Sequence, residues 1–113
     1  MSSNLFIGKI VTVTVDRPLG SYHPEYKDMY YPVNYGYIQG IMALDGEEQD
    51  AYILGINEVV DKFTGKIIAI VYRNDDIEEK WVVAPVDKTF TKEEIWKQIY
   101  FQEQYFDSEI IMA

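Results

Sequence analysis

The hexapeptide DGEEQD, at positions 45–50, holds four carboxylates in six residues. In an extended chain that runs into a turn, residues two apart point the same way, so Asp45 and Glu47 can converge and Asp50 can return from across the bend. Hard cations such as Mg²⁺ bind one or two carboxylates together with waters and substrate phosphates. On its own, however, the hexapeptide is more typical of a solvated acidic turn.

A second acidic group lies at positions 75–79 and is followed directly by Lys80. It comprises Asp75, Asp76, Glu78 and Glu79. The group separates two strand-like runs, KIIAIVYR and KWVVAP, so it is expected at the tip of a hairpin. Such a tip can discourage edge pairing by its charge alone, or it can supply further oxygen ligands to a shared cation site.

Aromatic and histidine side chains offer donors to an anionic ligand. Four tyrosines fall between positions 30 and 37, where their hydroxyls can donate to phosphate oxygens or their rings can pack at the edge of a core. His23 is the only histidine, and the chain has no cysteine and no recognisable serine elbow. The sequence therefore gives no support to serine or thiol hydrolase chemistry.

Short extended segments must position these groups. The stretch 8–16 alternates valine and threonine with the period of a half-buried strand, and 35–44 and 51–56 also read as extended. The runs 66–73 and 80–85 form the expected hairpin. Several short strands joined by turns predict a mainly β fold organised as a small barrel.

A helix is predicted after these strands. Thr91 and Glu94 have the spacing of a capping box, and Phe90 and Ile95 can close a hydrophobic staple around it. Ile99 continues the apolar face one turn later. This face is suited to packing on the barrel, so the C-terminal part of the chain is expected to cover one side of the strands.

Length, composition and charge limit the class of protein. With 113 residues, positions 1–113 are expected to form a single domain, and the absence of cysteine fits a reducing compartment such as the cytoplasm. No secretory signal or membrane span is recognisable. The net charge of −9 disfavours binding to nucleic acid or to an anionic membrane, and it suits divalent cations that carry an anionic substrate.

The segment YYPVNYGYIQGIMALDGEEQDAYIL as a whole resembles the signature region of the soluble family I inorganic pyrophosphatases. Tyr31, Pro32 and the run 34–38 match the family's aromatic segment, the spacer has the right length, and Asp45 and Asp50 fall on the first and third of its three aspartates. This joint match is specific, whereas the acidic hexapeptide alone is not.

The resemblance continues downstream, in a chain that is shorter than typical members. EEKWVVAP is similar to the family's lysine-containing strand, with Lys80 on the lysine and Glu78 on the aspartate two residues before it. Asp75 corresponds best to an earlier family aspartate, with Asn74 and Asp76 as alternatives.

Several positions depart from the family pattern. Glu47 replaces the middle aspartate of the signature, and His23 stands where the register from the signature would place a phosphate-binding arginine. Arg17 lies six residues before that histidine. Tyr105 falls on the family's phosphate-binding tyrosine, but Phe106 follows it where the family has a lysine.

The resemblance implies a closed barrel similar to an OB fold, with one helix packed on it. It also implies hydrolysis of inorganic pyrophosphate to two phosphates by a water whose pKa is lowered by Mg²⁺, or by Mn²⁺ in its place. The implied metal ligands are Asp45, Glu47, Asp50, Asp75 and Glu78. Glu47 and Asp50 would be catalytic, and the implied substrate-binding residues are Tyr35, Lys80, Tyr105 and His23.

Other functions are compatible with the same fold. The chain could be a binding module with weak or no catalysis, or a hydrolase of another phosphoanhydride, because fold alone does not fix function. A barrel that stacks single-stranded nucleic acid on its tyrosines is disfavoured by the negative charge. Since family members often assemble, the resemblance also implies a homo-oligomer.

Overall fold

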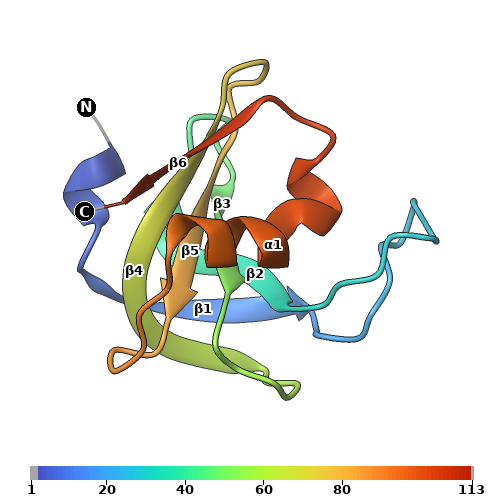
Figure 1. Ribbon diagram of the computed structural model, residues 1–113, viewed down its shortest axis with the longest axis horizontal. Helices are drawn as coiled ribbons and strands as arrows, with labels where there is room; N and C mark the ends of the chain where they lie inside the picture. The colour runs from blue at the N-terminus through green and yellow to red at the C-terminus, as the bar shows by residue number, and fades with distance from the viewer. Residues whose placement is uncertain (1–2, 113) are drawn as a thin grey trace.

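A computed structural model describes residues 3–112, which form six strands, one α-helix and a short 3₁₀ helix (Figure 1). In chain order the elements are η1 (Ser3–Phe6), β1 (Ile10–Arg17), β2 (Asn34–Met42), β3 (Glu48–Ile53), β4 (Lys62–Arg73), β5 (Glu79–Ala84), α1 (Lys92–Glu103) and β6 (Ser108–Met112). The strands expected from periodicity are all present. The sequence reading did not anticipate η1 or β6. Within residues 3–112, no helix combines the length and the hydrophobicity needed to cross a membrane.

Five strands close into a barrel in the order β1, β2, β3, β5, β4 and back to β1. All neighbouring pairs are antiparallel except β3 with β5, which are parallel. The long strand β4 makes this closure possible, because its first residues pair with β1 while residues 66–72 pair with β5. The second half of β4 also pairs with β6, which lies outside the barrel order. The prediction of a small closed, mainly β barrel with one C-terminal helix is therefore confirmed.

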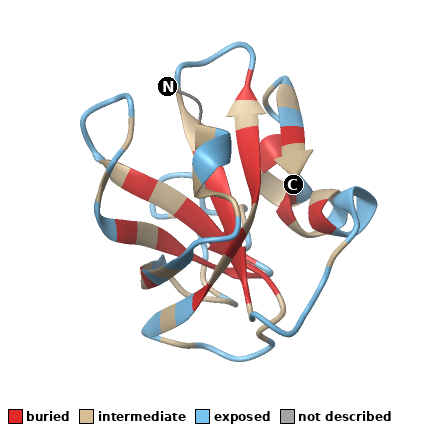
Figure 2. Ribbon diagram, turned by 90° about the vertical axis from the view of Figure 1, so that its left-hand side faces the viewer, coloured by how far each residue is buried: buried red, intermediate tan, exposed pale blue. Residues whose placement is uncertain are grey.

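Two apolar clusters lie on opposite faces of the strands, as their alternating patterns require. The first fills the barrel and draws on all five of its strands, with Trp81 as its largest side chain. The second lies between the outer face of the barrel and α1, where Ile95 and Ile99 pack against Tyr52 and Val82. Figure 2 shows the alternation as bands of buried and partly exposed residues along the strands. Because α1 is fixed by this second cluster, its C-terminal end holds a defined place beside the barrel.

The helix begins at the capping box predicted from the sequence. The Thr91 hydroxyl accepts a hydrogen bond from the backbone N–H of Glu94, and the Glu94 carboxylate accepts one from the backbone N–H of Thr91. Two donors that would otherwise lack a helical partner are thereby satisfied.

Replacing Thr91 by alanine is expected to lower the free energy of unfolding by about 1 kcal/mol, because one half of the capping box is lost. Chemical denaturation followed by circular dichroism measures this change. Thr89→Ala, in the exposed stretch just before the helix, is the matched control. An equal loss in both variants would mean that the capping contact does not stabilise the helix.

Candidate functional site

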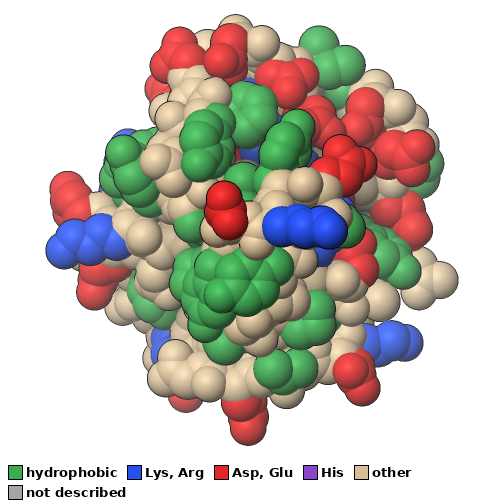
Figure 3. Space-filling view, turned by 90° about the vertical axis from the view of Figure 1, so that its right-hand side faces the viewer, with side chains coloured by type: hydrophobic (Ala, Val, Ile, Leu, Met, Phe, Trp, Pro, Cys, Tyr) green, Lys and Arg blue, Asp and Glu red, His purple; other side chains and the backbone are tan. Residues whose placement is uncertain are grey.

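A cleft of about 1170 Å³ opens on the outer side of the barrel, next to the C-terminal end of α1. Its walls come from the ends of β1 and β4, from β2, β3 and β5, from residues 101–106, and from the segment 23–32. That segment belongs to the loop that projects from the barrel in Figure 1. On this side of the molecule, apolar and tyrosine side chains occupy the centre and acidic groups surround them (Figure 3).

Strand register places a lysine and an aspartate side by side in the cleft. β3 and β5 run parallel with Ala51 opposite Trp81, so Asp50 and Lys80 occupy equivalent positions on neighbouring strands. Both project to the face that carries Tyr52, because side chains alternate along each strand. The Lys80 ammonium lies 2.5 Å from a carboxylate oxygen of Asp50. The parallel pairing of β3 with β5 thus creates this ion pair.

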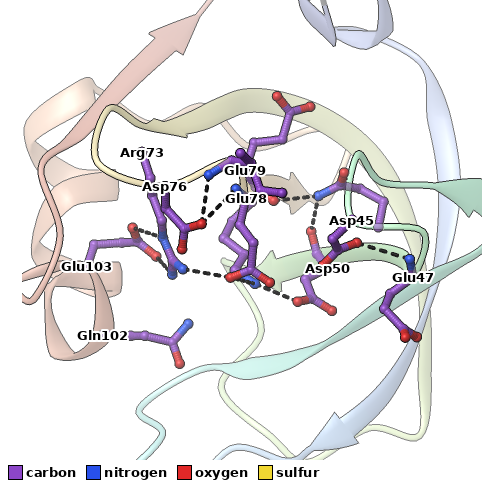
Figure 4. Close-up of polar contacts among 12 residues, drawn as sticks. Asp45, Glu47, Asp50, Arg73, Asp76, Glu78, Glu79, Gln102 and Glu103 are labelled. Carbon is purple, nitrogen blue, oxygen red and sulfur yellow. Dashed lines mark hydrogen bonds and ion pairs between the residues drawn. The ribbon is translucent and has the colours of Figure 1, made fainter.

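Arg73, the last residue of β4, connects the cleft to the interior. Its guanidinium lies between two carboxylates, 2.7 Å from that of Glu103 and 3.2 Å from that of Glu78, as Figure 4 shows. The guanidinium also stacks 3.7 Å from the centre of the Phe106 ring. Lys80 lies 3.8 Å from the same Glu78 carboxylate. Two cations therefore share Glu78 at the floor of the cleft.

Glu103 is a fully buried carboxylate that accepts four hydrogen bonds. Two come from Arg73, one comes from the Tyr52 hydroxyl at 2.5 Å, and one comes from the Ser108 hydroxyl at 2.7 Å. Burial raises the pKa of Glu103, but the hydrogen bonds from Arg73 and Tyr52 outweigh burial and the pKa lies below its ordinary value. The group is therefore ionised, and it fixes the orientation of Arg73.

A chain of hydrogen bonds extends from this buried pair to the far wall of the cleft. Gln102 donates to the Tyr52 hydroxyl at 2.8 Å and accepts from the Tyr31 hydroxyl at 3.2 Å. Arg17 in turn donates to the Tyr31 hydroxyl at 2.8 Å. Tyr35 lies beside this chain, and burial followed by the charge of Asp50 raises the pKa of its hydroxyl well above the ordinary value. These tyrosines are neutral donors at physiological pH.

A bulge in β1 brings a further carboxylate into the cleft. Val15 pairs with Gly36 and Arg17 pairs with Tyr35, so Asp16 is the extra residue of β1. Gly36 permits this close pairing, because a Cβ atom at that position would lie 1.9 Å from a backbone oxygen of β1. Burial raises the pKa of Asp16, and the charge of Asp50 adds to this effect against the opposing charge of Arg17. Asp16 and Asp50 are thus electrostatic neighbours.

The structure brings six of the nine sequence-predicted site residues to the cleft. They are His23, Tyr35, Asp50, Glu78, Lys80 and Tyr105. The Nδ1 of His23 accepts hydrogen bonds from the backbone N–H groups of Glu25 and Tyr26, so Nε2 is the ring nitrogen that can donate.

The other three predicted residues do not line the cleft. Asp45 and Glu47 are exposed in the turn between β2 and β3, where the backbone N–H of Glu47 donates to the Asp45 carboxylate at 3.0 Å. Asp75 accepts from the backbone N–H of Asp107 at 3.2 Å. The first carboxylate of DGEEQD therefore stabilises its own turn, that of Glu47 is exposed there, and that of Asp50 lines the cleft.

A divalent cation in the cleft would need oxygen ligands from its acidic side chains. Among residues 3–112, no three acidic or histidine side chains are gathered where they could hold one ion. Asp50 and Glu78, moreover, are already paired with cations. Mg²⁺ nevertheless often uses one or two carboxylates and completes its shell with waters and substrate phosphates. Asp16 and Asp50 are two cleft carboxylates near enough for the charge of Asp50 to raise the pKa of Asp16, and a cluster of five carboxylates is not present among residues 3–112.

Sequence reasoning missed four residues that shape the site. They are Asp16, Arg73, Gln102 and Glu103. Arg17 was noted only for its distance from His23, yet it supplies a guanidinium to the cleft. The available signal was the presence of charged residues at the ends of apolar strands and within the helix, where burial demands a partner of opposite charge.

This protein is similar to known proteins in its structure, whereas its sequence matches no family model and no curated protein. The structure is similar to an inorganic pyrophosphatase from Ehrlichia chaffeensis, with a TM-score of 0.71 and 18% identity, covering 94% of this chain and 87% of that chain. An inorganic pyrophosphatase from Coxiella burnetii gives a TM-score of 0.65 and 17% identity, covering 99% of this chain and 89% of that chain. An inorganic pyrophosphatase from Neisseria gonorrhoeae gives a TM-score of 0.65 and 18% identity, covering 87% of this chain and 74% of that chain.

The chain has the fold of the inorganic pyrophosphatases. The resemblance carried by positions 31–38 and by Asp50 and Lys80 is therefore matched by the architecture of the whole chain. At 17–18% identity the similarity establishes the pyrophosphatase fold, and the roles of individual residues rest on the cleft itself.

Proposed function

We propose that this protein binds inorganic pyrophosphate in the cleft and hydrolyses it to two phosphates with the help of Mg²⁺. The observation that supports the proposal is the Lys80–Asp50 pair, in which an ammonium group, suited to binding phosphate, and a carboxylate, suited to binding Mg²⁺, lie 2.5 Å apart on a pyrophosphatase fold. Phosphoryl transfer needs mainly positioning and charge stabilisation, and this pair supplies one group for each.

Each part of the cleft has a role in this proposal. Lys80 and Arg17 neutralise phosphoryl oxygens, and the hydroxyls of Tyr35 and Tyr105 donate hydrogen bonds to them. Asp16 and Asp50 would hold the metal ion. When bound, a divalent ion lowers the pKa of a coordinated water and offsets charge on the phosphates. The aromatic wall from segment 23–32 limits the access of bulk water.

The deciding experiment measures phosphate release from pyrophosphate with and without Mg²⁺. Asp50→Asn is expected to lower turnover at least about 100-fold, because it weakens the hold on the ion and frees Lys80 to move. Asp87→Asn, an exposed acid outside the cleft, is the charge-matched control. If the unaltered protein releases no phosphate in response to Mg²⁺, hydrolysis of pyrophosphate is ruled out.

Glu47→Ala tests whether the β2–β3 turn takes part in the reaction. Because Glu47 does not line the cleft, we expect a loss far smaller than that of Asp50→Asn. A loss as large as that of Asp50→Asn would show that the turn contributes a carboxylate to the reacting complex, as the family resemblance implies.

A second candidate is binding of a phosphoanhydride without turnover. It is favoured by the ion pairs that Asp50 and Glu78 form with Lys80 and Arg73, because these pairs reduce the negative charge left for a cation. Isothermal titration with pyrophosphate in the presence of EDTA distinguishes the candidates. Binding without Mg²⁺, together with no phosphate release when Mg²⁺ is added, would support this second candidate.

A further inference from the structure

The cations at the floor of the cleft differ from their shared partner in exposure. The side chains of Arg73 and Lys80 are only 3% and 5% exposed, whereas that of Glu78 is 34% exposed. Each cation also has a second carboxylate, Glu103 for Arg73 and Asp50 for Lys80. Among residues 3–112, Glu78 is therefore the one carboxylate partner common to both, and it contacts them from the open side of the cleft.

We propose that a phosphoryl group takes the place of the Glu78 carboxylate between Arg73 and Lys80, and that it does so without a metal ion. In the free protein, Glu78 acts as an internal counter-ion that competes with the ligand. This inference rests on the proposed function only in its choice of pyrophosphate as the ligand. It assigns Glu78 to the control of anion affinity, in place of the metal-ligand role that family resemblance implies.

The position of Arg73 does not depend on Glu78. Its Nε and Nη2 atoms donate to Glu103, at 3.1 and 2.7 Å, and its guanidinium rests on the Phe106 ring. Only Nη1 donates to Glu78. When Glu78 leaves, the guanidinium stays in place with a donor directed toward the cleft. A donor fixed in advance binds an anion with little loss of conformational entropy.

Lys80 is held in a similar way. Its ammonium stays 2.5 Å from Asp50 and lies 5.8 Å from the centre of the Tyr35 ring. The contact with Glu78, at 3.8 Å, is the longer of its two ion pairs. A phosphoryl group carries three oxygens, so it can accept from both the arginine and the lysine, and charge-assisted hydrogen bonds of this kind are strong.

Glu78 itself can leave at little cost. It directly precedes β5 in the turn from β4, and about a third of its side chain already faces solvent. Once displaced, its carboxylate is hydrated, although it remains near the bound phosphate and repels it. Removing this charge should therefore strengthen binding of the phosphate.

The test measures pyrophosphate binding by isothermal titration calorimetry in EDTA at low ionic strength. Glu78→Gln is expected to bind roughly tenfold more tightly than the unaltered protein, because a competing anion and a repulsive charge are lost together. Glu93→Gln makes the same change of charge at an exposed position of α1 outside the cleft, and Glu93 forms no ion pair with either cation. Its effect should stay within about twofold.

A second variant removes one of the two cations. In the Glu78→Gln background, Lys80→Met should abolish the gain in affinity, because half of the site is missing. Thermal unfolding shows whether each variant is folded, and Asp50 can tolerate the loss of Lys80 because its side chain is 37% exposed.

Two results would overturn the inference. The first is that, in EDTA, the Glu78→Gln variant binds pyrophosphate no more tightly than the unaltered protein does. The other is that the increase in pyrophosphate affinity caused by Glu78→Gln remains when Lys80→Met is added. Neither result depends on turnover, so a protein that hydrolyses no pyrophosphate can still support the inference, and an active enzyme can still contradict it.

Discussion

Replacing Glu103 by glutamine is expected to lower the free energy of unfolding by about 3 kcal/mol or more at neutral pH. Breaking a buried ion pair leaves an uncompensated charge, which costs about 3–5 kcal/mol. Here the charge is that of Arg73, which would keep only the partly exposed Glu78 as a partner. For a chain of this length, such a loss lowers the melting temperature by roughly 10 °C or more. Differential scanning calorimetry measures this change.

Glu109→Gln is the matched control, because it makes the same chemical change at an exposed position of β6.

The effect of Glu103→Gln on the free energy of unfolding should also depend on pH. The pKa of Glu103 in the folded protein lies below its ordinary value of 4.5. Its contribution to stability is therefore complete above about pH 4.5 and is lost as pH falls through the lower folded-state pKa. The difference between the two proteins should shrink on acidification, and a constant difference would argue against an ionised Glu103.

Local patterns were sufficient to predict most of the fold. The alternation in 8–16 places one set of side chains in the barrel core, and the capping box at Thr91 satisfies donors within one turn of helix. Both signals depend on residues close together in the sequence. The strand β6 could not be read in this way, because its pairing with the second half of β4 joins residues at least 35 positions apart.

The site was predictable only in part for the same reason. Asp50 and Lys80 belong to motifs that the family resemblance identifies, and both lie in the cleft. Arg73 and Glu103 belong to no such motif, and their contact joins the end of β4 to the end of α1. The two leading acids of DGEEQD show the limit of the resemblance, because it implies a metal site that includes them whereas in the structure neither lines the cleft.

These differences change the electrostatic character expected of the site. A cluster of five carboxylates would bind metal ions first and the anion through them. Asp50 and Glu78 in the cleft are each paired with a buried cation, and so is the buried Glu103, which does not line the cleft. Direct contacts between cations and phosphate therefore carry more of the proposed binding, and removal of a cation should have the largest effect on function.

Lys80→Gln is expected to lower pyrophosphate turnover by roughly 100- to 1,000-fold, the range found when one preorganised electrostatic contact to the transition state is removed. It should also weaken pyrophosphate binding in EDTA at least about tenfold, since a buried charge-assisted contact is lost. Phosphate release and calorimetric titration measure the two effects separately. Because Lys80 lies between Asp50 and Glu78, it affects both the anion and the carboxylates around it.

Two further variants separate a direct contact from a general effect of charge. Lys97→Gln removes a positive charge from an exposed position of α1 and should change neither turnover nor binding more than about twofold. Lys80→Arg keeps the charge but changes the shape of the donor, so it should restore binding better than turnover, because turnover demands closer positioning. If Lys80→Gln retains full binding in EDTA, then Lys80 does not contact the phosphate, and its pairing with Asp50 serves the fold alone.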